Sequence, residues 1–117
     1  MTTKGIRGAI TVDNNTEEAI KLATLELLNN IFEKNNLNGT SNLSHIIFTT
    51  TEDLDAAFPA KFARTEFGCD KVAMMCFNEL NVPNSLKMCL RVLVVVNCSQ
   101  DFAPVFVYLK GAKNLRN

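Results

Sequence analysis

The feature that most constrains the fold is a long apolar stretch at residues 89–98, which contains a single charged residue, Arg91. Its side chains are mainly leucine and valine and do not alternate with polar ones, a pattern that predicts a β-strand covered on both faces. The most apolar part, residues 90–96, is far too short to span a bilayer. A buried guanidinium without a partner costs several kcal/mol, so Arg91 requires a carboxylate, solvent at a strand end or an anionic ligand.

The rest of the chain alternates between β-like and helical patterns. We expect strands at residues 6–12, 45–50, 71–77 and 105–109, helices at residues 16–35 and 59–67, and a short helical turn near Leu86. Asn15 is the predicted N-cap of the first helix, paired with Glu18, and Pro59 suits the first turn of the second. The pattern indicates one domain, residues 1–117, of the α+β class, with helices packed on one face of a mixed sheet.

Composition excludes several classes of protein. Twelve basic and twelve acidic residues cancel, so no overall field draws the chain to nucleic acid or to a membrane. His45 is the only histidine and there is no CxxC pair, so a zinc site is not supported. Without a Walker loop or a Rossmann glycine fingerprint, we expect neither cofactor nor metal. Met1-Thr-Thr-Lys leads into Gly5 without an apolar signal segment, which favours a cytoplasmic protein with reduced thiols.

Arginine is scarce in this chain. Against eight lysines there are four arginines: Arg7, Arg64, Arg91 and Arg116. Arg7 lies between Gly5 and Gly8, where the backbone could approach a ligand closely, although an ordinary surface arginine is the more common case. Lys61 and Arg64 are three residues apart on the second predicted helix and share a face. They could trap a carboxylate or form a solvated basic face.

Three further side chains are candidates for a site. Glu79 closes a strand and could accept a hydrogen bond from a substrate hydroxyl, while Cys76 could line the same pocket or act as a small hydrophobe. Tyr108, the only tyrosine, could donate to a carboxylate or pack at a strand end. With His45 as the single histidine, a Cys-His nucleophile is not expected. The inventory favours binding an anion and stabilising developing negative charge.

The ordered set of segments resembles the monofunctional, trimeric chorismate mutases, whose fold is a pseudo-α/β barrel. The matching segments are Gly5-Ile-Arg-Gly-Ala-Ile-Thr-Val12, Asp53-Leu-Asp-Ala-Ala-Phe-Pro-Ala-Lys-Phe-Ala-Arg64, Met75-Cys-Phe-Asn-Glu79, Val82-Pro-Asn-Ser-Leu86, Cys89-Leu-Arg-Val92, Val107-Tyr-Leu109 and Leu115-Arg116. Asn84 stands where the family usually has glycine, and asparagine tolerates the left-handed backbone that such a turn needs. Glu52 stands where the family usually has proline.

The resemblance implies a cofactor-free Claisen rearrangement of chorismate to prephenate, a step of the shikimate pathway in aromatic amino-acid biosynthesis. Arg91 matches the arginine that contacts the substrate ether oxygen, where negative charge grows as the C–O bond breaks. Arg7 and Tyr108 match groups that bind a substrate carboxylate. Glu79 and Cys76 match residues around the ring hydroxyl.

The resemblance also implies a homotrimer with its active sites between neighbouring subunits. Phe58, Lys61 and Arg64 match a helix-end segment contributed by the adjacent subunit. Leu115 and Arg116 match a mobile tail beside the substrate.

Two other readings stay open. One is an enamine/imine deaminase, a family with the same trimeric barrel shape and an arginine at the subunit cleft. The other is a non-catalytic trimer that binds a small carboxylate without turning it over.

Overall fold

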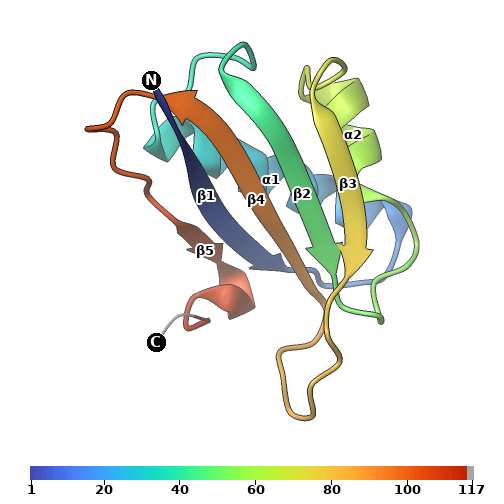
Figure 1. Cartoon of the computed structure of the whole chain (residues 1–117). Coiled ribbons are helices and arrows are strands. Elements are labelled where there is room, and N and C mark those ends of the chain that lie inside the picture. The colour runs from blue at the N-terminus through green and yellow to red at the C-terminus, as the bar shows by residue number, and fades with distance from the viewer. Residues whose placement is uncertain (116–117) are drawn as a thin grey trace.

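The computed structural model describes residues 1–115 and has an α+β architecture (Figure 1). Its elements in chain order are β1 (Thr2–Thr11), α1 (Glu17–Lys34), β2 (Leu43–Thr50), α2 (Pro59–Glu66), β3 (Ala73–Asn78), β4 (Cys89–Cys98), β5 (Val107–Leu109) and the 3-10 helix η1 (Lys110–Ala112). Both α-helices lie behind the sheet in the view of Figure 1. The predicted α+β class, with a mixed sheet and helices on one face, is therefore confirmed.

The described sheet has five strands in the order β3-β2-β4-β1-β5. The apolar strand β4, which has the predicted bounds, lies at the centre and runs antiparallel to both β1 and β2. β3 is parallel to β2, and β5 is parallel to β1. The register aligns one row of residues across four strands: Thr49, Arg91, Ala9 and Tyr108. Because paired residues point to the same face of a sheet, these four share one face.

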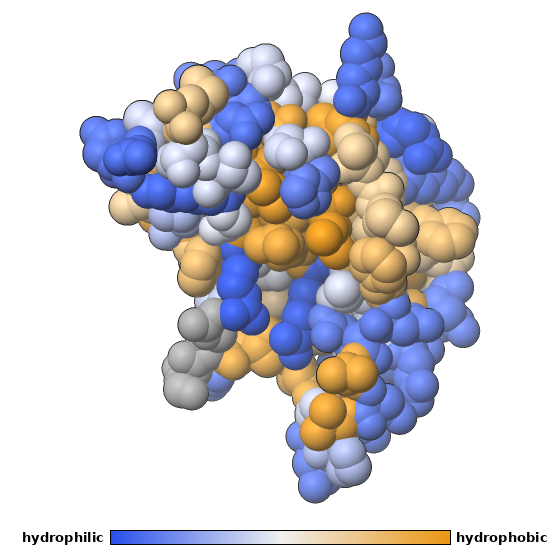
Figure 2. Space-filling model, viewed as in Figure 1, coloured by the Kyte–Doolittle hydropathy of each residue, from blue (hydrophilic) through white to orange (hydrophobic). Residues whose placement is uncertain are grey.

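The two faces of the sheet differ in what covers them. The strand residues that face the helices are fully buried: Ile6, Ile10, Ile46, Phe48, Leu90 and Val94. They pack in one core with Leu27, Leu28 and Ile31 of α1, which are also fully buried. The opposite face, here called the open face, carries Arg91 and Leu93, which are only half-buried. Within the single chain β4 is therefore fully covered on one face only, because both α-helices pack on the same side; on the open face Cys89 is buried beside Ala112 of η1, while Arg91 and Leu93 stay half-buried. Figure 2 shows apolar side chains gathered over the open face, with hydrophilic ones directly below them.

The start of α1 differs from the prediction by one residue. Thr16 is the N-cap: its backbone is extended and its side chain accepts a hydrogen bond from the Ala19 amide at 3.1 Å. The predicted N-cap, Asn15, instead holds a neighbouring loop, since its side-chain oxygen accepts from the amides of Asp55 and Ala56, both at 3.0 Å. With the helix starting one residue later, Glu18 is at the second helical position and the predicted capping box does not form.

The connection between β3 and β4 is an irregular loop rather than the predicted helical turn near Leu86. Asn84 has a left-handed backbone with φ of 66°, which confirms that asparagine can replace glycine in this turn. Glu52, the other departure from the family pattern, accepts a hydrogen bond from the Asn81 side chain at 2.9 Å. The loop is thereby attached to the segment that follows β2.

The two glycines that flank Arg7 have packing roles on opposite faces. A Cβ at Gly8 would lie 2.7 Å from Ile31 Cδ1 and 3.1 Å from Leu27 Cδ1, so this position lets α1 approach the sheet. At Gly5 the nearest atom would be Leu93 Cδ1 at 3.0 Å, on the half-buried open face. Gly8 therefore brings a helix close to the sheet, and its backbone does not face the pocket suggested by the sequence.

This difference gives a prediction about stability. Gly8→Ala is expected to lower the free energy of unfolding by about 1–3 kcal/mol, because the methyl group enters a fully packed layer. Gly5→Ala is expected to cost clearly less, because the Leu93 side chain can move toward the open face. Denaturant midpoints of both variants at one protein concentration test this. A larger loss for the Gly5 variant would contradict the assignment.

Candidate active site

The strongest polar feature of the open face is a contact between Arg91 and Glu79. Arg91 Nε lies 3.4 Å from Glu79 Oε2, and the two side chains are 31% and 24% exposed. Glu79 reaches this position because its amide donates to the Thr50 carbonyl at 2.9 Å, which extends the pairing of β3 with β2 by one residue. The half-buried charge of Arg91 thus has a carboxylate nearby, one of the three environments that the sequence analysis allowed for it.

The ion pair is loose. The Nε atom of Arg91 is shielded from solvent and has no hydrogen-bond partner, although Glu79 Oε2 is nearby. The carboxylate oxygen instead accepts a hydrogen bond from the Thr49 hydroxyl. A buried donor without an acceptor is costly, and it marks a place where an anionic ligand could bind.

Tyr108 lies on the same row as Arg91, with the small Ala9 between them. Its hydroxyl is also shielded from solvent and has no hydrogen-bond partner. Leu86 and Leu115 pack with Tyr108 against Ala9 and the buried Cys89. Together these side chains form an apolar wall beside the guanidinium of Arg91.

Arg7 also belongs to this face. It precedes Ala9 by two residues on β1, and side chains two apart on a strand point the same way. Arg7 is paired with Leu93, the residue two positions beyond Arg91 on β4. Arg7 and Arg91 are therefore diagonal neighbours across two strands, and with Tyr108 they give the open face a cluster of cationic and hydroxyl donors.

Cys89 lies below this cluster but is not a nucleophile. It is fully buried, and burial raises the pKa of its thiol, an effect that the nearby Arg91 guanidinium offsets only in part. The thiol therefore stays protonated at neutral pH, when thiolate is the reactive form. All four cysteines of the chain are free.

A second group of the predicted residues meets at the edge strand β3. Phe58, Lys61 and Cys76 line a hollow of about 540 Å³, and Arg64 joins them in a shallower one of about 310 Å³. Phe58 is 72% exposed, and Lys61 is held by Glu17 at 3.0 Å. The N-cap residue Phe58 and helix α2 thus present an aromatic ring and two cations beside the edge strand β3.

Cys76 belongs to this second group. Its register partner on β2 is the fully buried Phe48, so Cys76 points toward the helices and away from the face that carries Arg91. Burial raises the pKa of its thiol, opposed in part by a hydrogen bond with the backbone of Ala60. Within one chain the structure does not bring Cys76 to Glu79, although the resemblance gives them a shared role.

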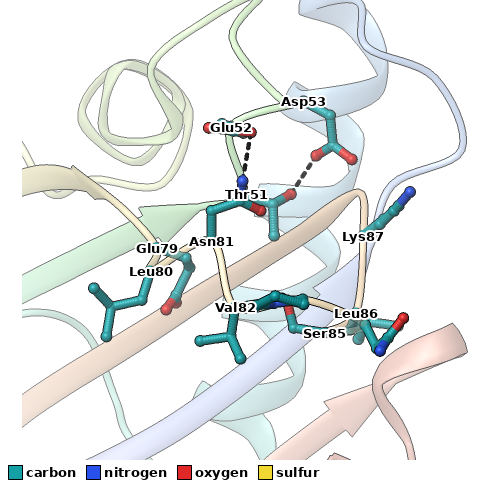
Figure 3. A pocket seen from close by; sticks show the side chains of 12 residues that line it. Thr51, Glu52, Asp53, Glu79, Leu80, Asn81, Val82, Ser85, Leu86 and Lys87 are labelled. Atoms are coloured by element: carbon teal, nitrogen blue, oxygen red, sulfur yellow. Dashed lines mark hydrogen bonds between the residues drawn. The ribbon is translucent and has the colours of Figure 1, made fainter.

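A third hollow, of about 390 Å³, lies between residues 51–53 and the loop at residues 79–87 (Figure 3). Three carboxylates, Glu52, Asp53 and Glu79, line it against one cation, Lys87, and this excess of negative charge opposes the binding of an anion. Its hydrogen bonds instead hold the loop: Asn81 donates to Glu52, and the Met88 amide donates to Asp53 at 3.1 Å. This hollow therefore supports the position of Glu79 and of the entry to β4.

Thr49 is the part of the site that sequence reasoning did not find. In the sequence it is one of several β-branched residues of a strand, and only the pairing of β2 with β4 places it opposite Arg91.

Arg116 was predicted at the rim of the site and lies outside the described residues. Among residues 1–115, no group of three or more histidine, cysteine or acidic side chains is arranged to hold a metal ion. No helix in that range is long and apolar enough to cross a membrane.

Fold and site together describe a small α+β protein whose open sheet face carries arginines and unpaired donors. The sequence profile of the family described as chorismate mutase type I matches residues 3–117. Because the match covers nearly the whole chain, the protein belongs to the type I chorismate mutases. These are isomerases that act in aromatic amino-acid biosynthesis, with chorismate as the substrate and prephenate as the product.

Individual relatives agree with this assignment. Chorismate mutase AroH of Thermus thermophilus is 45% identical over 114 residues, which cover 97% of this chain and 93% of the relative. Chorismate mutase AroH of Bacillus subtilis is 40% identical over 96 residues, which cover 82% and 75% of the two chains. The solved structure of a chorismate mutase from Clostridium thermocellum superposes with a TM-score of 0.87 at 46% identity, covering 95% of this chain and 98% of the other.

Proposed function

We propose that the chain rearranges chorismate to prephenate on the open face of its sheet, with Arg91 as the catalytic cation. The observation that carries this is the unpaired Arg91 Nε, a shielded donor on a half-buried guanidinium. In the rearrangement one C–O bond breaks as a C–C bond forms within the same molecule, so no nucleophile or base is required. A fixed donor at the ether oxygen, where charge grows in the transition state, is the type of group that contributes most.

The other donors suit the two carboxylates of the substrate. Arg7 and the unpaired hydroxyl of Tyr108 would hold a carboxylate, and Glu79 would accept from the ring hydroxyl. Held at both ends, the flexible dianion would be kept in its reactive conformer, which removes much of the entropic barrier. Arginine suits this role better than lysine because its planar fork fixes two hydrogen bonds and stays charged.

We further propose that the active protein is a homotrimer whose clefts are shared between subunits. Two observations support it. The half-buried open face carries apolar side chains, and Met75 and Phe77 of the edge strand β3 are 60% and 47% exposed. The cluster at Phe58, Lys61 and Arg64 is also separate from the one at Arg91, so a neighbouring copy could complete each site.

Four free cysteines fit a reducing compartment, and we propose a cytoplasmic location.

Loss of chorismate absorbance, followed by acid conversion of the product to phenylpyruvate, tests the activity. We expect turnover that is unchanged by a metal chelator and needs no added nucleotide, because the rearrangement breaks and forms its bonds within one molecule. A folded trimer that binds chorismate without consuming it would support the alternative of a non-catalytic binding protein. Release of ammonia from an enamine, with no prephenate formed, would support the deaminase.

A further inference from the structure

Thr49 contacts the carboxylate of Glu79 beside Arg91. It lies directly opposite Arg91 in the register of β2 with β4, on the same face. Its hydroxyl donates a hydrogen bond to Glu79 Oε2, the same oxygen that lies 3.4 Å from Arg91 Nε. One carboxylate oxygen therefore accepts a hydrogen bond from the Thr49 hydroxyl and lies near Arg91 Nε, which has no hydrogen-bond partner.

This arrangement differs from what an arginine and a carboxylate form by themselves. Such pairs are commonly bidentate, with two parallel N–H···O bonds that use the donors of the arginine. A Glu79 closed onto Arg91 in that way would occupy the Nε donor that an anionic substrate needs. The Thr49 hydroxyl donates to Glu79 Oε2, which occupies one of the two lone pairs of that oxygen and restrains the orientation of the carboxylate relative to Arg91 Nε.

We infer that Thr49 is a positioning residue, which holds Glu79 close to Arg91 but not hydrogen-bonded to its Nε, so that this donor stays available to substrate. The inference deepens the proposed function and rests on it. Thr49 touches the substrate in no step; it acts through Glu79. Its effect therefore depends on the presence of the Glu79 carboxylate.

Five variants test this role. Thr49→Val keeps the shape of the side chain and removes the hydroxyl, and Thr49→Ser keeps the hydroxyl. Thr3→Val is the matched control, because Thr3 is also a strand threonine with a side-chain hydrogen bond, to Asn97 at 3.0 Å, far along the sheet. Glu79→Ala, alone and combined with Thr49→Val, shows whether the hydroxyl acts through the carboxylate. Thermal melting of each variant monitors folding.

We expect Thr49→Val to lower kcat/KM by about tenfold or more, the scale of one hydrogen bond to a charged group, with a rise in KM as well as a fall in kcat. Thr49→Ser should restore most of the activity, and Thr3→Val should match the unmodified protein. In the Glu79→Ala background, Thr49→Val should change kcat/KM less than about twofold, because the coupling partner is gone.

Three results would overturn the inference: normal kcat/KM in Thr49→Val, failure of Thr49→Ser to restore activity in a folded protein, or an equal loss from Thr49→Val with and without Glu79. Calorimetric titration of the same variants with prephenate, a stable dianion, gives the same comparison without turnover. Absence of turnover in the unmodified protein would then count against the proposed function, while the coupling measured by binding would still decide the role of Thr49.

Discussion

Replacing Arg91 with alanine is expected to lower kcat by about 10²–10³-fold, the cost of removing one preorganised donor from a transition state. The reason is the position of its guanidinium, whose Nε is shielded, unpaired and 3.4 Å from the carboxylate of Glu79. The fold should survive, because Arg91 lies on the open face while the core residues of β4 face the helices. Glu79 would keep its hydrogen bond from Thr49 and stay partly exposed.

Arg91→Lys is the matched control for charge. It keeps one positive charge but loses the planar fork, so its activity should lie between those of the alanine variant and the unmodified protein. Steady-state kinetics give kcat and KM, and thermal melting together with sedimentation shows whether assembly is retained. Near-normal turnover in a folded Arg91→Ala protein would contradict the assignment of Arg91 as the catalytic cation.

The sequence was most informative where its pattern was long and continuous. The bounds of β4 were predicted correctly because ten consecutive residues, mostly apolar, leave little choice of structure. The start of α1 was missed because two adjacent residues, Asn15 and Thr16, are both good caps, and only the interaction of Asn15 with the loop at residues 55–56 decides between them. We predicted that β4 is covered on both faces. An apolar strand has the same sequence pattern whether helices of its own chain or other copies of the chain cover it.

The site was only partly predictable, because its contacts depend on strand order. Arg91 and Glu79 were both candidates, but their pairing follows from β2 lying between β3 and β4. Thr49 carries no signal of its own and gains its role from the register. Gly8 was associated with a ligand pocket, whereas its missing side chain lets Ile31 of α1 approach the sheet. In each case the missing information was which side of the sheet the residue faces.

Removing both cations beside β3, Lys61 and Arg64, is expected to lower activity about as much as replacing Arg91. The double variant Lys61→Ala/Arg64→Ala should lower kcat/KM by about 10²-fold or more, since it deletes up to two charge-assisted contacts to a dianion. The fold should tolerate the change. Lys61 and its partner Glu17 are both about half exposed, and exposed ion pairs contribute little to stability. The loss would therefore report on the substrate cleft.

The central claim is that one cleft is built from two chains, and co-assembly of two inactive variants tests it most directly. Arg91→Ala and Lys61→Ala/Arg64→Ala chains are co-expressed with different tags, and mixed trimers are purified through both. In a cyclic trimer that contains both kinds of chain, one of the three clefts combines an intact Arg91 with an intact neighbouring Lys61 and Arg64, so activity should return to about a third of the unmodified level. The two variants purified separately and combined only in the assay are the control. Mixed trimers no more active than that control would show that each site lies within a single chain, and would contradict the shared cleft.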